Sequence, residues 1–592
     1  MGYTENMSST YLSSGNPCLD FFYHVVPDTP PETLTRRLVE SWDHDPLITL
    51  KLICNLRGVR GTGKMDKEGF YTSALWLHRN HPKTLACNVA SMAAFGYFKD
   101  LPELLYRLLK GSDARKKENE QRPKKTSFRF FRQQRGRQSK AQKAAVVKMK
   151  QKERKIVPRE ERISAEKKRM EAVKEFANKI RHEKKYTMAK KAVDRYKRDP
   201  DYRFLYDRVS DHFAECLRSD IKFLEEGKVR KISLAAKWCP SLNQSFDRST
   251  LLCESIAKKV FPRGEYAEYD GVEEGHYTYR VRDRLRKEIL VPLRKALELP
   301  EVYIGKNEWG LIPYNRVASV AMTLYKDKFL KHDETRFQEY LENAKSGKAT
   351  IASGALLPHE IISRLRGYDG GLVAELQWKR MVDDMAKIGK FNNCLAICDV
   401  SGSMIGQPMD VCGALGILVS ELSKEPWKGK VITFSQNPTL QMVKGKNLKS
   451  KTQFMRKMEW GMNTNFQKVF DLILEVASIK GRLRKKDMIK RVFVFSDMEF
   501  DQASKKPWET DYKVIKRKFE EKGYEVPDMV FWNLRDSRAT PVLGKENGVA
   551  LVSGFSKNLM KLFMKNGGVI NPEIVLESVI SGEEYSKLVV VD

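Results

Sequence analysis

The chain has 592 residues, with 108 Lys and Arg against 76 Asp and Glu, a formal net charge of +32. This length predicts several domains, and the charge predicts a polyanionic partner such as nucleic acid or an acidic membrane surface. No apolar run is long enough to span a bilayer, and the N-terminus carries no signal-peptide core. We therefore expect a soluble protein of the cytoplasm, the nucleus or both, without a membrane as partner.

Residues 1–110 predict the N-terminal part of a helical-repeat domain. Pro46 and Pro82 each open an apolar run with helical periodicity, at the first-turn position that proline favours. Their offset, 82 − 46 = 36 residues, is typical of stacked helical pairs, whose apolar faces are covered by their neighbours.

Residues 111–200 form a basic insertion with 32 Lys and Arg against 12 Asp and Glu, a net charge of +20. Up to about residue 145 the segment has few aliphatic residues, which predicts disorder. Residues 160–196 are rich in good helix formers and predict a long solvated helix. Helical periodicity with apolar content then continues through residues 201–385, which we interpret as the remainder of the helical-repeat domain.

Residues 386–592 change to short apolar runs that alternate with helical stretches. The runs lie at residues 394–398, 431–434, 492–495, 529–532 and 550–552. Strands that are apolar on both faces and separated by helices predict a mainly parallel sheet covered on both sides. The fold class is therefore an all-α helical-repeat domain with a basic insertion, followed by a doubly wound α/β domain.

A carboxylate and two hydroxyls follow the first strand of this predicted sheet, at Asp399, Ser401 and Ser403. Thr464 stands just before a predicted helix, and Asp497 follows the strand at residues 492–495. Open α/β sheets bind their ligands at the carboxyl ends of the strands, and hard oxygen ligands suit Mg²⁺. The five residues predict a magnesium site.

These five residues resemble the metal-ion-dependent adhesion site of von Willebrand factor type A domains. By that resemblance Ser401 and Ser403 bind the metal directly, and Thr464 binds it directly or through water. Asp399 and Asp497 bind mainly through water, and the sixth position is left for a partner's carboxylate.

The domain order resembles the Ro autoantigen family, in which HEAT-like repeats form a ring closed by a type A domain and bind small RNAs. A closer resemblance is to an uncharacterised plant family with the same layout. It rests on residues 12–22, 55–64 and 397–404.

Aromatic and cationic residues alternate within the basic insertion, where phosphates can pair with Arg and bases can stack on rings. The alternative interpretation is a basic linker without RNA contact. The candidate RNA-binding residues are Phe128, Arg129, Phe130, Phe131, Arg132, Arg135 and Arg137.

Residues 58–65 nearly match the phosphate-binding P-loop motif. That motif requires a preceding strand and a hydroxyl after its Lys, whereas a predicted helix precedes this loop and Met65 replaces the Ser or Thr. A glycine-rich turn between two helices is the better interpretation.

Two functions remain open. The first is a non-catalytic ribonucleoprotein-type protein that binds RNA and recruits an acidic protein partner through Mg²⁺ in the type A domain. The alternative is a protein-interaction scaffold that uses the metal site without RNA. An enzyme is not expected, because no nucleophile and base stand beside the predicted metal site.

Overall fold

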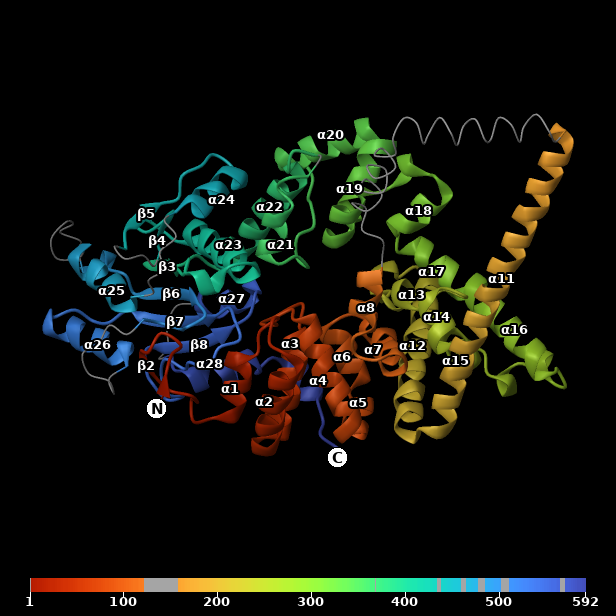
Figure 1. Ribbon diagram of the computed structural model, residues 1–592, viewed down its shortest axis with the longest axis horizontal. Coiled ribbons are helices and arrows are strands. Elements are labelled where there is room, and N and C mark those ends of the chain that lie inside the picture. Colours follow the sequence, from red (N-terminus) through yellow and green to blue (C-terminus); the bar gives the residue numbers. More distant parts are fainter. Residues whose placement is uncertain are drawn as a thin grey trace. The chain divides into compact units, whose positions relative to one another are not determined.

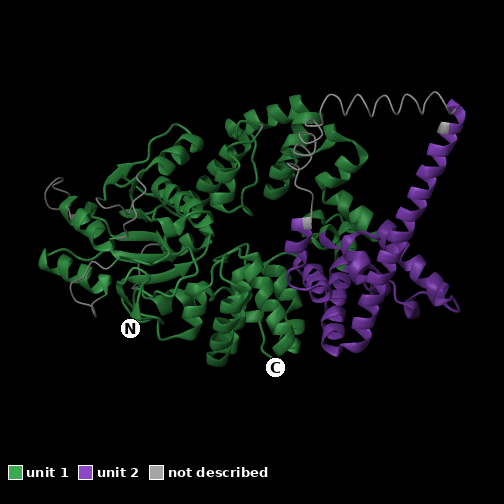
Figure 2. Ribbon diagram, in the orientation of Figure 1, with its two compact units in different colours: residues 1–98, 219–237, 289–592 green, residues 99–218, 238–288 purple. Residues whose placement is uncertain are grey.

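The computed structural model describes residues 2–121, 158–367, 369–433, 438–458, 465–476, 485–501, 510–564 and 570–592. The chain forms two compact units (Figure 2). The first unit contains residues 1–98, 219–237 and 289–592, and the second contains residues 99–218 and 238–288. None of the described helices is long and apolar enough to cross a membrane.

The N-terminal helices of the first unit begin where the sequence places proline. Helix α3 begins at Pro46 and α5 at Pro82, and Asp45 caps α3 by accepting a hydrogen bond from the Ile48 amide at 2.8 Å. Both starts agree with the sequence pattern. The bounds are α1 Pro17–His24, α2 Pro31–His44, α3 Pro46–Arg57, α4 Lys67–Asn80, α5 Pro82–Cys87 and α6 Val89–Phe95.

The helical run predicted to open at Pro82 is divided into α5 and α6 at Asn88. The Asn88 side chain donates to the carbonyl oxygens of Thr84 and Val589, both at 2.7 Å. The Val589 amide donates back to Asn88 Oδ1 at 3.1 Å, and the Asp592 carboxylate accepts from the Thr84 amide at 2.9 Å. The C-terminal residues therefore pack against this helix break.

The second unit is made of helices in its described residues. Its longest helix, α11, spans 40 residues and is exposed over most of its length (Figure 1). Its bounds agree with the solvated helix predicted over residues 160–196. The helices are α7 Asp100–Lys110, α8 Ala114–Gln121, α11 Arg159–Arg198, α12 Pro200–Glu225, α14 Ser245–Thr250, α15 Leu252–Val260 and α16 Glu274–Arg284.

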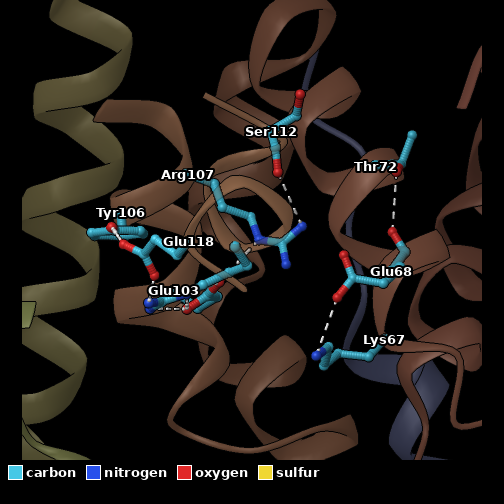
Figure 3. A network of polar contacts seen from close by, with 9 residues as sticks. Lys67, Glu68, Thr72, Glu103, Tyr106, Arg107, Ser112 and Glu118 are labelled. Atoms are coloured by element: carbon cyan, nitrogen blue, oxygen red, sulfur yellow. Dashed lines mark hydrogen bonds and ion pairs between the residues drawn. The ribbon is translucent and has the colours of Figure 1, made fainter. Parts of the chain in front are cut away.

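Helix α8 corrects the prediction of disorder for residues 111–121. Glu103 of α7 accepts from Arg107 at 3.0 Å and from Arg115 of α8 at 2.7 Å. Glu118 accepts from Arg115 at 2.9 Å and from the hydroxyl of Tyr106. Figure 3 shows the labelled Glu103, Arg107 and Glu118 of this network. The ion pairs hold α8 on α7 although α8 has almost no apolar side chains.

The remaining helices of the first unit precede and cover the sheet. Helix α22 runs from Leu372 to Ile388 and packs against α21 and α23. The bounds are α13 Ala235–Trp238, α17 Val291–Ala296, α18 Pro300–Lys306, α19 Ser319–His332, α20 Glu334–Lys345, α21 Pro358–Ser363, α22 Leu372–Ile388, α23 Gln407–Leu422, α24 Leu448–Lys457, α25 Phe466–Glu475, α26 Asp511–Glu521, α27 Met560–Met564 and α28 Pro572–Val579.

Six strands form one sheet in the order β5-β4-β3-β6-β7-β8 (Figure 1). All neighbouring strands are parallel except the edge strand β5, which is antiparallel to β4. Strand β3 pairs with β6 through Cys394 opposite Arg491 and Cys398 opposite Phe495. The chain is thus a helical part followed by an α/β domain. The strands are β3 Cys394–Cys398, β4 Lys430–Thr433, β5 Leu440–Met442, β6 Arg491–Ser496, β7 Asp528–Asn533 and β8 Val549–Ser553.

An N-terminal arm, residues 2–14, packs on the α/β domain. It contains a two-stranded antiparallel pair, β1 Gly2–Tyr3 and β2 Ser9–Thr10. The Thr4 hydroxyl donates to the Phe500 carbonyl oxygen at 2.7 Å, and Ser8 Oγ donates to the Asp511 carboxylate at 2.8 Å. The arm therefore covers the segment that follows β6.

Candidate metal centre in the alpha/beta domain

Two buried carboxylates meet where the strand order of the sheet reverses. From β3 the chain moves outward to β4 and β5 and then returns to β6 on the other side of β3. Asp399 follows β3 and Asp497 follows β6, and the two residues are 0% and 1% exposed. This position at the carboxyl ends of the strands is the place where open α/β sheets bind ligands.

Asp399 is held in place by the loop that carries the two serines. Its Oδ1 accepts from the Ser401 amide at 2.9 Å, and its Oδ2 accepts from Ser496 Oγ at 2.6 Å. The hydroxyl oxygens of Ser401 and Ser403 lie 3.0 Å apart. Three of the residues predicted to bind the metal are therefore together in one loop.

The electrostatics at this position disfavour two neighbouring negative charges. Burial, and after it the negative charge of Asp497, raise the pKa of Asp399 to about 6. The hydrogen bonds from Ser401 and Ser496 act in the opposite direction and do not offset this effect.

Asp497 has one buried carboxylate oxygen without a partner among the described residues. Its Oδ1 accepts from the Glu499 amide at 3.2 Å, but its buried Oδ2 has no hydrogen-bond partner among the described residues. The next residue, Met498, has a φ of 66°, a left-handed conformation that is uncommon for a side chain of this size. Buried polar atoms are nearly always partnered. This oxygen is therefore a candidate for binding a cation.

The donors suit a hard divalent cation. Two carboxylates and two hydroxyls supply only oxygen atoms, as Mg²⁺ prefers. Within the described ranges no group of three or more His, Cys, Asp and Glu side chains could hold a metal ion, so any metal here relies on the hydroxyls. Thr464, the fifth predicted ligand, lies outside the described residues.

Two neighbours of this centre were missed from the sequence. Ser496 ends strand β6, where a buried hydroxyl gives no signal of its role, yet it bonds Asp399. Arg535, which follows β7, donates to the Ser403 carbonyl oxygen at 2.5 Å. Beside the loop lies a cavity of about 300 Å³, whose lining includes Val400, Gly406 and Asp410.

The glycine-rich loop at residues 58–64 is a packed turn. Lys64 is fully buried, and its ammonium donates to the carbonyl oxygens of Phe22 and Val25, the latter at 3.1 Å, and to Ser553 Oγ at 2.7 Å. A Cβ atom on Gly63 would lie 2.0 Å from the Gly58 carbonyl oxygen. Lys64 thus connects α1 to the end of β8 and is not directed at a phosphate.

The candidate RNA-binding residues of the basic insertion, Phe128 to Arg137, lie outside the described residues. The described part of the insertion still carries much of its charge. Helix α11 has 15 Lys and Arg against seven Asp and Glu.

Comparisons with known proteins give two family matches. A family model described as Domain of unknown function (DUF2828) matches residues 4–391, and one described as Domain of unknown function (DUF7788) matches residues 393–588. An uncharacterized protein of Acanthamoeba polyphaga mimivirus is 28% identical over 604 residues, which cover 98% of this chain and 87% of the relative.

One solved structure is also similar over most of its length. The crystal structure of the Deinococcus radiodurans RO (RSR) protein is 12% identical and aligns over 96% of this chain and 99% of that chain, with a TM-score of 0.32. A likeness of this degree carries no inference about function.

Proposed function

Since the chain belongs to the family described as Domain of unknown function (DUF2828), we propose its function from its own residues. It is a non-catalytic binding protein whose α/β domain captures a partner's carboxylate through Mg²⁺. The observation that carries this proposal is the buried, unpartnered Oδ2 atom of Asp497 beside the buried carboxylate of Asp399.

Ser401 and Ser403 would hold the cation with their hydroxyls, and the two carboxylates would supply the opposing charge. When bound, Mg²⁺ supplies a positive centre that accepts one further oxygen ligand. The described groups that donate hydrogen bonds to Asp399 and Asp497 are hydroxyls and backbone amides. In this proposal Asp399 and Asp497 act as ligands of the cation and not as catalytic groups.

We assign the α/β domain to the von Willebrand factor type A class as part of the same proposal. The metal motif after β3, the second carboxylate after β6 and the antiparallel edge strand β5 support this assignment. Thr464 is then a further ligand, and the helical part before the domain corresponds to HEAT-like repeats of a Ro-like protein.

A second function, RNA binding, is favoured by the charge of α11. The helix combines a net charge of +8 with exposure along most of its 40 residues, so its cations are accessible to phosphates. The two functions together describe a ribonucleoprotein component. The metal-dependent function alone describes a protein-interaction scaffold.

Magnesium should stabilise the protein, and the effect should depend on pH. Without metal, Asp399 keeps its proton up to about pH 6 in the folded state, whereas in the unfolded chain it loses that proton at about pH 4. The contribution of this group to stability is present below about pH 4 and is lost as the pH rises through about 6. Mg²⁺ competes with the same proton, so its affinity falls about tenfold per pH unit below about pH 6.

Thermal unfolding with Mg²⁺ and with chelator measures this effect. We expect Mg²⁺ at about a hundred times its dissociation constant to stabilise the protein by about 2.7 kcal/mol at about pH 7.5. The same concentration should stabilise it by only about 1.4 kcal/mol at about pH 5, where the affinity is about tenfold lower. Equal stability with Mg²⁺ and chelator at neutral pH would contradict the metal proposal.

RNA binding should weaken when cations on the exposed face of α11 are reversed. We expect Lys167→Glu, Lys168→Glu and Lys174→Glu together to lower RNA affinity and to reduce the slope of log affinity against log salt by about 0.7 to 0.9 per lost phosphate contact. Fluorescence anisotropy with a labelled structured RNA measures both quantities.

A matched control makes the same charge change elsewhere, with Lys446→Glu, Lys513→Glu and Lys545→Glu, all exposed in the α/β domain. If both triple variants lose the same affinity, net charge alone is responsible. If the wild type binds no RNA at physiological salt, the scaffold function stands alone.

A further inference from the structure

The first unit contains a cavity of about 410 Å³. Its lining residues differ from those of the candidate metal centre and of the cavity beside it. Its walls come from the loop after α3, from residues 353–355, from α22 and from the η10 turn (Lys557–Leu559) with α27. Its volume falls within the range of small-molecule sites. Three cations line it, namely Arg60, Lys557 and Lys561.

Each of the three cations donates to a neutral backbone carbonyl oxygen. The distances are 3.1 Å for Arg60, 3.2 Å for Lys557 and 3.1 Å for Lys561. The acceptors are the carbonyl oxygens of Ala94, Leu356 and Gly61, in that order. Carbonyl oxygens carry no net charge, so these bonds leave the positive charge of the cavity uncompensated.

One carboxylate lines the cavity, and other cations already share it. Asp384 forms ion pairs with Arg380 at 2.8 Å and with Lys387 at 3.6 Å. The lining therefore holds more positive than negative charge.

The pKa of Lys557 is lowered in this cavity. Its side chain is buried, with 6% of the residue exposed. Burial, and next the positive charge of Lys561, lower the pKa of Lys557 to about 8, against the smaller opposing effects of Asp384 and Glu360. Burial also lowers the pKa of Lys561. A bound anion would raise both pKa values and so favour the charged form of both ammonium groups.

Ser353 provides an independent sign of a ligand. It lines the same cavity and is 3% exposed, and its hydroxyl has no hydrogen-bond partner among the described residues. A buried hydroxyl without a partner is costly, and a ligand oxygen in the cavity would accept its hydrogen bond. Helix α22 also lines the cavity, with the apolar side chains of Met381, Met385 and Ile388 beside Asp384.

We propose that this cavity binds a small organic phosphate, with its phosphoryl oxygens on Arg60, Lys557, Lys561 and Ser353 and its organic group on the apolar wall of α22. Phosphate oxygens accept hydrogen bonds and carry the negative charge that the lining lacks. The glycine-rich loop contributes through Arg60 and not through Lys64, so this site is not a P-loop. It is independent of the metal-dependent function.

Isothermal titration of the full chain with adenosine monophosphate and, separately, with inorganic phosphate tests the proposal. We expect adenosine monophosphate to bind at least several-fold more tightly than inorganic phosphate, because only it uses the apolar wall. Chelator is present throughout, so failure of this site and failure of the metal site are distinguishable.

Two variants and one control locate the binding. We expect Lys561→Ala to weaken adenosine monophosphate binding at least about tenfold, as the loss of a charge-assisted contact predicts. Ser353→Ala should weaken it several-fold without lowering the melting temperature, because the hydroxyl has no partner to lose. Lys513→Ala, at an exposed position of α26, should bind as the wild type does. The proposal is overturned if neither probe binds the folded wild type at millimolar concentration, or if both cavity variants keep wild-type affinity.

Discussion

Asp399→Asn is expected to abolish Mg²⁺ binding without unfolding the protein. The amide keeps the shape of the carboxylate and can keep both hydrogen bonds, since its oxygen accepts from the Ser401 amide and its NH₂ group can donate to Ser496 Oγ. It removes one of the two buried negative charges that a cation would neutralise. We expect the dissociation constant for Mg²⁺ to rise at least about a hundredfold, which corresponds to about 2.8 kcal/mol.

The same substitution should not lower the stability of the metal-free protein. Because burial and Asp497 together disfavour the charged form of Asp399, the uncharged amide should leave stability at neutral pH unchanged or raise it. Calorimetry with Mg²⁺ and thermal unfolding in chelator measure the two effects separately. If Asp399 had only a structural role, the variant would be less stable than the wild type in chelator as well.

Asp410→Asn is the matched control for this experiment. Asp410 lies on α23 of the same domain, is half-exposed, and pairs with Arg456 at 2.9 Å. We expect it to bind Mg²⁺ as the wild type does. If Asp399→Asn keeps wild-type affinity, or if Asp410→Asn loses as much, the cation is not held where we propose.

Glu103→Ala should cost about 3 to 5 kcal/mol of stability in the second unit. Glu103 and Arg107 have side chains that are 6% and 5% exposed, and Arg115 of α8 adds a second cation to the same carboxylate. Removal of Glu103 takes away the carboxylate that pairs with the buried guanidinium of Arg107, and α8 loses a main attachment. Chemical denaturation monitored by circular dichroism measures the loss.

Two further variants separate charge from packing in this network. Glu118→Ala removes a half-exposed carboxylate from the same cluster, and its ion pair should contribute less than about 1 kcal/mol. Replacing Glu103 and Arg107 together by Met removes both buried charges and should recover most of the stability. If Glu103→Ala and Glu118→Ala cost the same, the network does not depend on buried charge.

The sequence predicted best what local pattern determines. Strands β3 and β6 are short apolar runs between helices, so the pattern located both and placed Asp399 and Asp497 at their ends. Proline at the first turn located the starts of α3 and α5. Strand β5 was missed because its three residues are partly exposed and lie at an edge, where no apolar run is needed.

What the sequence did not predict depends on partners far along the chain. The N-terminal arm has two strands of two residues each, and its contacts with Phe500 and Asp511 leave no mark on its own composition. Helix α8 is ordered by a carboxylate on α7, against a composition typical of disorder. The burial of Lys64 likewise follows from acceptors on α1 and β8.

The contacts of the arm also delay folding during synthesis. Thr4 bonds Phe500, 496 positions later, and a ribosome that adds roughly 5 to 20 residues per second needs about 25 to 100 s to cover that distance. During this interval the arm has left the ribosome without its partner. The contacts of Asn88 with Val589 and of Thr84 with Asp592 span still longer separations along the chain. The α/β domain can therefore form its contacts with the arm only after residue 500 has been synthesised. A nascent chain that stalls before residue 500 would carry an arm open to chaperones and proteases.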